Sequence, residues 1–260
     1  MAIPSLIENQ SEWDFYFCTV EDKPASIMLD LALIHAAPVS ENTEFLQIII
    51  TLNSPNEHGL TSPAEAEILY IMEDRLAEQI SLNLGGIYAG RNTTDGQRIF
   101  YFYCQSSYDY ERIVDEAMEG FSNHQYHVRA QKDPDWDFYC QFLYPSQLEY
   151  QSILNRRVID NLKKHGDDLS VPRDIEHYLY FPTQALREAF EEKAIAENFR
   201  VISRNFDAGE GENPYGLVIA REDAIDTQVM DEIVMFLVLK AAEEKGEYDG
   251  WGTGLGIHTS

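Results

Sequence analysis

The alternation of apolar and polar positions predicts that strands dominate the first half of the chain. Runs rich in aromatic and β-branched residues are separated by short polar turns. These runs cover residues 13–20, 25–33, 45–52, 87–92, 98–105 and 126–131. Asp95-Gly96 lies between two of them and is a strong hairpin signal, because both residue types accept the left-handed backbone of a two-residue turn.

Two helical segments interrupt these strands. Apolar residues at spacings of three and four between Ile68 and Ile80 predict one face of a helix. Ser62-Pro63-Ala64-Glu65 predicts its start as a capping box, and Gly85-Gly86 predicts its end. Helix-compatible residues recur at 108–121. The order from residue 45 is therefore strand, helix, strand, strand, helix, strand, which is typical of a ferredoxin-like domain.

The second half repeats this order after a helix that a second capping box, Ser146 with Glu149, begins. The predicted strands are 177–181, 199–206, 215–221 and a terminal segment from 247, with helices N-capped by Thr183 and Asp226. We therefore predict an α+β fold of two tandem ferredoxin-like (βαββαβ) α/β sandwich domains. They span residues 1–145 and 169–260, and a linking helix and a break occupy 146–168.

The net charge of the chain limits the kinds of molecule that it is expected to bind. The chain carries 45 acidic and 19 basic residues, a net charge of −26. Residues 1–145 hold 23 acidic and 7 basic residues and the remainder holds 22 and 12, so both halves are acidic. Direct nucleic-acid binding is disfavoured, because it depends on Lys and Arg at phosphates. A basic protein or a cation is an easier partner, although acidity that serves only solubility is the simpler explanation.

The cysteines and the apolar segments indicate a cytoplasmic protein. Cys18, Cys104 and Cys140 lie in aromatic, strand-like stretches without metal-ligand spacing, so we expect buried free thiols in a reducing compartment. Residues 1–8 lack the pattern of a signal peptide. The most apolar window, 229–239, is too short to span a membrane and is expected to be a buried helix.

The C-terminal sequence Glu247-Tyr248-Asp249-Gly250-Trp251-Gly252-Thr253, together with the order of elements from about residue 176, resembles the family of bacterial regulators of ribonuclease E activity B. The resemblance implies a ferredoxin-like α+β sandwich. For the enterobacterial members it also implies inhibition of an RNA-degrading endonuclease through binding to that enzyme.

Residues 13–145 resemble a bacterial domain of unknown function, family 695, which is often fused to such a regulator domain. The resemblance rests on the Trp-Asp-Phe-Tyr openings, on Tyr88-Ala89-Gly90-Arg91, and on the segment from Asp133-Pro134-Asp135-Trp136 to Leu143-Tyr144-Pro145. It implies no function.

The candidate binding residues are Tyr248, Asp249, Gly250 and Trp251. Gly246 is expected as the left-handed residue that ends the last helix, and Asp249-Gly250 as a tight turn that brings Trp251 back to the sheet. One interpretation is structural, with Trp251 at a core edge. In the other, Tyr248 and Trp251 are aromatic anchors at a partner surface and Asp249 meets a basic group.

Other motifs carry weaker signals. The related stretches at 12–16 and 135–139 are interpreted as structurally similar strands. Glu73-Asp74, Asp115-Glu116 and Glu191-Glu192 lie on predicted helices and are expected to be solvated. His124 and His127 would face opposite sides of a strand, which argues against a shared metal. We therefore predict no catalytic residue, metal site or cofactor.

Two main functions remain open at this point. The first is a non-enzymatic, acidic protein-binding adaptor or regulator, whose partner is a basic or RNA-processing protein. The alternative is an enzyme or small-ligand-binding protein with a site between the two domains. A third possibility is an oligomer formed by pairing of edge strands.

Overall fold

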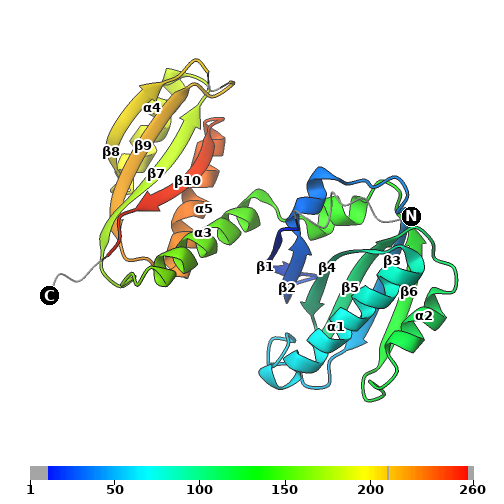
Figure 1. The fold of residues 1–260 in the computed structure, drawn as a ribbon. Coiled ribbons are helices and arrows are strands. Elements are labelled where there is room, and N and C mark those ends of the chain that lie inside the picture. Colours follow the sequence, from blue (N-terminus) through cyan, green and yellow to red (C-terminus); the bar gives the residue numbers. More distant parts are fainter. Residues whose placement is uncertain (1–10, 210, 257–260) are drawn as a thin grey trace. The chain divides into compact units, whose positions relative to one another are not determined.

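A computed structural model describes residues 11–209 and 211–256 (Figure 1). The chain divides into two compact units, residues 1–149 and 150–260. Each unit contains one sheet, with helices packed against it, so the predicted two-domain α+β fold is confirmed. Residues 1–8, for which the sequence predicts no signal peptide, lie outside the described residues.

The first unit is a ferredoxin-like core with an added hairpin. Its six-stranded antiparallel sheet has the order β1-β2-β4-β5-β3-β6. Within it, β3-α1-β4-β5-α2-β6 is the predicted ferredoxin-like series, and β1 and β2 extend the sheet beyond β4. The elements are β1 (Trp13–Val20), β2 (Lys23–Asp30), the 3-10 helix η1 (Leu31–His35), β3 (Glu44–Thr51), α1 (Pro63–Leu84), β4 (Ile87–Thr94), β5 (Gln97–Cys104), α2 (Tyr110–Ala117) and β6 (Tyr126–Lys132).

Both faces of this sheet are covered. On one face, α1 and α2 pack on Leu46, Ile48 and Ile50 of β3 and on Phe100 and Phe102 of β5. The other face carries a second, aromatic core beneath residues 133–145, which include the π-helical turn η2 (Tyr139–Leu143). There Trp136 stacks on Tyr103 with ring centroids 3.9 Å apart, and its Nε1 donates to the Asn42 carbonyl at 2.8 Å.

This aromatic core corrects several sequence predictions. Residues 137–143 are helical and not a strand, so the two related stretches at 12–16 and 135–139 do not share a structure. Cys140 is consequently exposed and Cys18 is only half-buried, and of the three cysteines only Cys104 is buried. The strand predicted at 25–33 ends at Asp30, because the Asp30 side chain accepts from the Ala32 N–H and caps η1.

The start of α1 also differs from the prediction. Ser62 is the N-cap residue, but its side chain makes no capping hydrogen bond. Glu65 does not return to the helix terminus. Its carboxylate accepts from the N–H groups of Asn53 (2.7 Å) and Ser54 (2.9 Å) and lies 3.0 Å from His124 Nε2. Glu65 therefore fixes the loop between β3 and α1.

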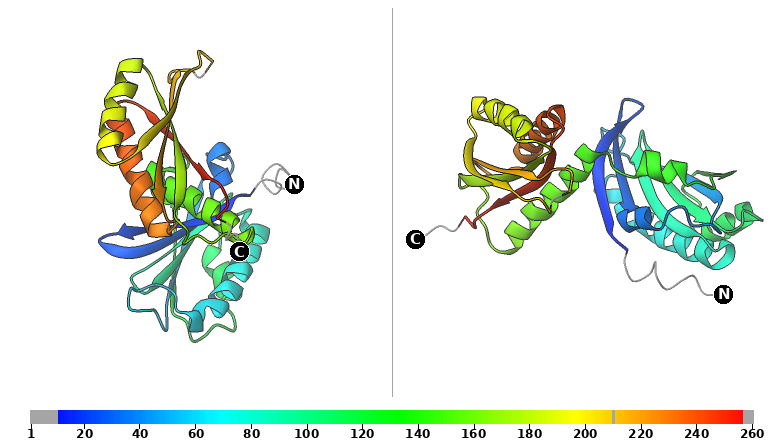
Figure 2. Two further views of the ribbon diagram at one scale, coloured as in Figure 1. Left: turned by 90° about the vertical axis from the view of Figure 1, so that its left-hand side faces the viewer. Right: turned by 90° about the horizontal axis from the view of Figure 1, so that it is seen from above.

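The second unit has the predicted βαββαβ order and the sheet order β10-β7-β9-β8, which is the ferredoxin-like arrangement. Its elements are α3 (Gln147–Lys164), β7 (Arg173–Phe181), α4 (Gln184–Ala196), β8 (Arg200–Phe206), β9 (Tyr215–Asp223), α5 (Thr227–Glu243) and β10 (Glu247–Thr253). Figure 2 shows α4 and α5 together on one face of this sheet.

Local helix signals in this unit are confirmed. The side chains of Thr183 and Asp226 accept from N–H groups in the first turns of α4 and α5. At the start of α3, Ser146 N donates to Glu149 Oε2 at 2.7 Å and Glu149 N donates to Ser146 Oγ at 3.4 Å, which is the reciprocal pattern of a capping box.

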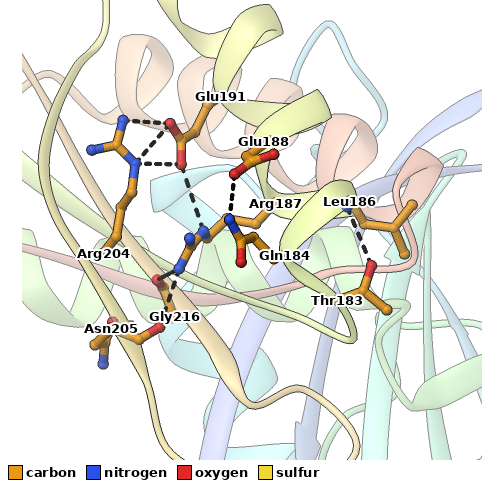
Figure 3. Close-up of polar contacts among 9 residues, drawn as sticks. All are labelled: Thr183, Gln184, Leu186, Arg187, Glu188, Glu191, Arg204, Asn205 and Gly216. Atoms are coloured by element: carbon orange, nitrogen blue, oxygen red, sulfur yellow. Dashed lines mark hydrogen bonds and ion pairs between the residues drawn. The ribbon is translucent and has the colours of Figure 1, made fainter.

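The expectation that the acidic helix pairs are solvated is wrong for two members. Glu73 and Glu191 are buried, because each holds an arginine that projects from a strand. Figure 3 shows Glu191 of α4 between Arg187 and Arg204, with two oxygens facing the Arg204 guanidinium. Arg187 also donates to the carbonyls of Asn205 (3.2 Å) and Gly216 (3.4 Å), so this cluster ties α4 to the hairpin β8–β9.

We expect Glu65→Gln to destabilise the first unit at pH 7 by about 1–3 kcal/mol, because buried donors lose a charged acceptor. Burial opposes ionisation of Glu65, but the hydrogen bonds from Asn53, Ser54 and His124 more than offset it and lower its pKa. A lowered folded-state pKa gives stability above the unfolded pKa of about 4.3, and this stability is lost as the pH falls further. Urea unfolding should therefore show a difference at pH 7 that shrinks below about pH 4, whereas the exposed Glu67→Gln serves as the control.

Candidate functional site

The predicted site residues lie on β10, and the local backbone differs from the expected tight turn. Tyr248 pairs with Leu179 and Gly250 with Tyr178, so Asp249 is an extra residue in a β-bulge. Gly250 has φ 135°, a value that side chains disfavour. Because of the bulge, Tyr248 and Trp251 lie on the same face of the sheet although they are three positions apart.

The residue that ends α5 in the left-handed conformation is Lys245, with φ 54°, and not Gly246 as predicted. Gly246 N donates to the Ala241 carbonyl at 2.8 Å and Lys245 N to that of Ala242 at 3.0 Å. Gly246 is required for space, because a Cβ there would lie 2.4 Å from the Phe181 ring. Close packing thus brings β10 directly against the end of β7.

Tyr248 supports the strand from inside. Its side chain is buried, and its hydroxyl lies 2.9 Å from Nδ1 of His177, which is also fully buried. Burial, together with the nearby positive charge of Arg221, lowers the pKa of His177 to about 3. The imidazole is therefore neutral at physiological pH, and the pair holds β10 to β7 without a buried charge.

Trp251 connects β10 to α3. The indole is half-buried, and its Nε1 donates to Asn155 Oδ1 at 2.8 Å. The Asn155 amide in turn donates to Asp231 Oδ1 at 2.8 Å, and Ser152 Oγ donates to Asp231 Oδ2 at 2.9 Å. This chain of hydrogen bonds positions α3 beside β10 and beside the first turns of α5.

A groove of about 270 Å³ lies between α3 and β10. Its mostly apolar lining includes Leu154, Val158, Tyr178, Asp249, Gly250 and Trp251. Asp249 is exposed, because the bulge turns it away from the core. We call this feature the β10 groove. It offers a mostly apolar surface that the exposed carboxylate of Asp249 and the half-buried Arg157 border.

The β10 groove brings together Asp249, Gly250 and Trp251 but excludes the buried Tyr248. Sequence reasoning did not identify the contribution of α3. Leu154 and Val158 are four residues apart and half-buried, beside the fully buried positions Ile153 and Ile159. An apolar pair next to the buried positions of a helix can indicate a binding surface in the sequence. What Leu154 and Val158 face, however, depends on how α3 packs. The binding role of these residues remains a prediction.

Burial and then the negative charge of Glu149 raise the pKa of the Cys18 thiol to about 11, and burial raises that of Cys104 to about 12, so both thiols stay protonated. Within residues 11–209 and 211–256, no group of three or more His, Cys, Asp or Glu side chains could hold a metal ion. None of the described helices is long and apolar enough to span a membrane.

The two units match two families. Residues 11–144 match a family of unknown function, DUF695, and residues 152–253 match the family called regulator of ribonuclease activity B. The chain therefore belongs to the DUF695 family, and its second unit is a regulator of ribonuclease activity B domain. This arrangement is the one that the two sequence resemblances indicated.

Comparison with other proteins adds little to this assignment. No curated protein matches the chain. A protein of unknown function from Galdieria sulphuraria is 8% identical, with 81% of this chain and 99% of that chain covered and a TM-score of 0.24. A candidate glycine cleavage system transcriptional repressor is 9% identical, with 82% and 98% covered and a TM-score of 0.24. At these scores the likeness carries no functional argument.

The neutral state of His177 leads to a pH-dependent stability. The folded-state pKa lies below the unfolded value of about 6.5, so the unfolded state binds more protons and stability falls as the pH falls through this window. From pH 6.5 to pH 5 we expect a loss of about 2 kcal/mol from this group. Denaturation followed by ¹⁹F NMR of fluorotryptophan at Trp251 should show that His177→Gln removes this loss, and that the exposed His165→Gln keeps it. An unchanged slope in His177→Gln would contradict the buried, neutral imidazole.

Proposed function

We propose that the chain is a non-enzymatic, cytoplasmic regulator that binds a basic, RNA-processing protein, a ribonuclease, through the β10 groove. The family of the second unit supports a role in regulating ribonuclease activity. We choose this groove as the site because it combines an apolar floor with the half-buried Trp251 and the exposed Asp249.

Each part of the groove has a role in this proposal. Leu154, Val158 and Trp251 accept an apolar or aromatic side chain of the partner, since buried aromatic contacts dominate binding energy at interfaces. Asp249 pairs with a Lys or Arg of the partner at the rim. Tyr248 does not touch the partner. It keeps the bulge in place through His177.

The charge of the surrounding surface supports a basic partner. Residues 146–260 carry 22 acidic and 12 basic side chains, a net charge of −10. Such a surface accelerates encounter with a positively charged protein and favours correct orientation, and salt weakens both effects. We therefore expect binding that is strongest at low ionic strength.

The test uses the full chain and purified ribonuclease E from the same source organism, with binding measured by calorimetry and cleavage measured on a fluorogenic RNA. We expect binding and a reduced cleavage rate. Asp249→Lys should weaken binding about tenfold, because a charge at the rim changes from attractive to repulsive. Leu154→Glu should weaken it further by placing a charge in the apolar floor. Trp251→Phe, which keeps the ring but loses the bond to Asn155, should have a smaller effect.

The matched control is Glu197→Lys, which makes the same change of sign at an exposed helix end of the same unit, away from the groove. It should retain binding apart from a small general effect of charge. The site is wrong if Glu197→Lys weakens binding as much as Asp249→Lys does. The proposed function is wrong if the wild-type chain neither binds the nuclease at low salt nor changes its rate.

A further inference from the structure

The added hairpin of the first unit leaves a pocket on the face of the sheet that carries α1. Because β1 and β2 extend the sheet beyond β4, they form a floor to one side of this helix. A pocket of about 360 Å³ lies there. Strands β1, β2, β4 and β5, Tyr70 of α1 and the loop 56–61 surround it. Its size lies within the range of small-molecule sites.

Two arginines carry the positive charge of this pocket. Arg91 of β4 pairs with the buried Glu73, which also accepts from the Tyr88 hydroxyl at 2.8 Å. Arg98 of β5 is 5% exposed, and among the described residues its side chain donates only to neutral acceptors, Thr93 Oγ1 at 3.1 Å and Thr61 Oγ1 at 2.7 Å. Two guanidinium groups thus share one carboxylate.

The Arg98 charge is not balanced by this arrangement. Among the described residues, Arg98 Nη1 is buried without a hydrogen-bond partner. A buried charge without a counterion is costly, and this chain has 45 acidic residues from which one could have been placed nearby. The half-exposed Tyr70 ring covers both guanidinium groups, whose central carbons, Cζ of Arg91 and of Arg98, lie 5.3 and 5.9 Å from the ring centroid. The face of a ring stabilises a cation less than an anion does.

The corresponding cluster in the second unit, also of two arginines and one glutamate, compensates its positive charges differently. There Arg187 donates to two backbone carbonyls, and Arg204 is half-exposed, so that water solvates part of its charge. Arg98 has neither form of compensation within the described residues. Arg187 Nε also lacks a hydrogen-bond partner, but it lies 3.6 Å from Glu191 Oε1 in an ion pair, whereas Arg98 forms no ion pair among the described residues.

The opposite wall of the pocket is apolar and aromatic. Phe15 and Phe17 of β1 form an edge-to-face pair with centroids 5.6 Å apart, and Met28 lies beside them on β2. Phe17 is 64% exposed, an unusual position for a large apolar side chain that has no other task. A flat apolar group would bury these rings.

We propose that this pocket, the arginine trough, binds a small molecule that carries an oxyanion on a flat apolar ring. The oxyanion, a carboxylate or a phosphate, lies at Arg98 and Arg91, where a planar guanidinium can donate two parallel hydrogen bonds. The ring lies between Tyr70 and the pair Phe15 and Phe17. This site is within the first unit and does not depend on the β10 groove.

Titration of the full chain with benzoate, phenyl phosphate and benzamide, followed by calorimetry and by NMR, tests the proposal. Benzamide has the shape of benzoate without its charge. We expect benzoate or phenyl phosphate to bind and benzamide to bind at least about tenfold more weakly, as expected for the loss of charge-assisted hydrogen bonds. Whichever of the two anions binds more tightly identifies the oxyanion.

Three variants locate the site. Arg98→Met should reduce anion affinity about tenfold or more, whereas Arg112→Met, which removes an exposed arginine of α2, should leave it unchanged. Phe17→Ser changes an exposed side chain, so the chain should keep its fold, and it should weaken binding several-fold. This variant decides the matter if Arg98→Met does not fold.

Three results would overturn the proposal. The first is equal binding of benzoate and benzamide, and the second is the absence of any binding at millimolar concentrations of the two anions. The third is anion binding that neither Arg98→Met nor Phe17→Ser affects, since this places the anion elsewhere. None of these results bears on ribonuclease binding, which involves the second unit.

Discussion

The pairing of β2 with β4 is the interaction on which the architecture of the first unit depends. It runs from Ala25↔Thr94 to Leu29↔Gly90 and joins the hairpin β1–β2 to a ferredoxin-like core. Gly90 makes it possible, because a Cβ there would lie 2.4 Å from the Met28 carbonyl oxygen. The added strands then support the aromatic core on one face of the sheet and the arginine trough on the other.

Buried carboxylates on helices are the second kind of interaction that holds this structure together. The side chains of Glu65, Glu73 and Glu191 are all nearly inaccessible to solvent, in a chain that has 45 acidic residues. Each accepts hydrogen bonds from a different element, namely a loop, strand β4 and strand β8. A buried carboxylate is tolerated when several donors surround it, and it then fixes the elements that supply those donors. The helices are thereby held to the sheets in one register.

The two proposed sites differ in chemistry because the surroundings of their charged groups differ. In the β10 groove the charged group, Asp249, is exposed on a bulge and can exchange water for a partner's cation. In the arginine trough the charged group, Arg98, is already desolvated, so an anion that enters meets a donor that has lost its water. The first arrangement suits a protein surface. The second suits a small molecule.

The sequence by itself determined the order of the elements and most of their boundaries. The Asp95-Gly96 hairpin, the capping box of Ser146 and Glu149, and the caps Thr183 and Asp226 depend on contacts within a few residues, so local chemistry suffices to predict them. It also indicated the family of each unit, and the specific motif at 247–253 contains three of the residues around the β10 groove.

Only the tertiary structure decided how those elements pack and which side chains they bring into contact. It placed residues 137–143 as helical turns against Tyr103, it buried Glu73 and Glu191, and it turned Asp249 outward on a bulge. It also paired Leu154 and Val158 with Trp251, and it left Arg98 Nη1 buried without a hydrogen-bond partner among the described residues. Each outcome depends on strand register and helix packing between residues far apart in the chain, and no local pattern of residues specifies those contacts.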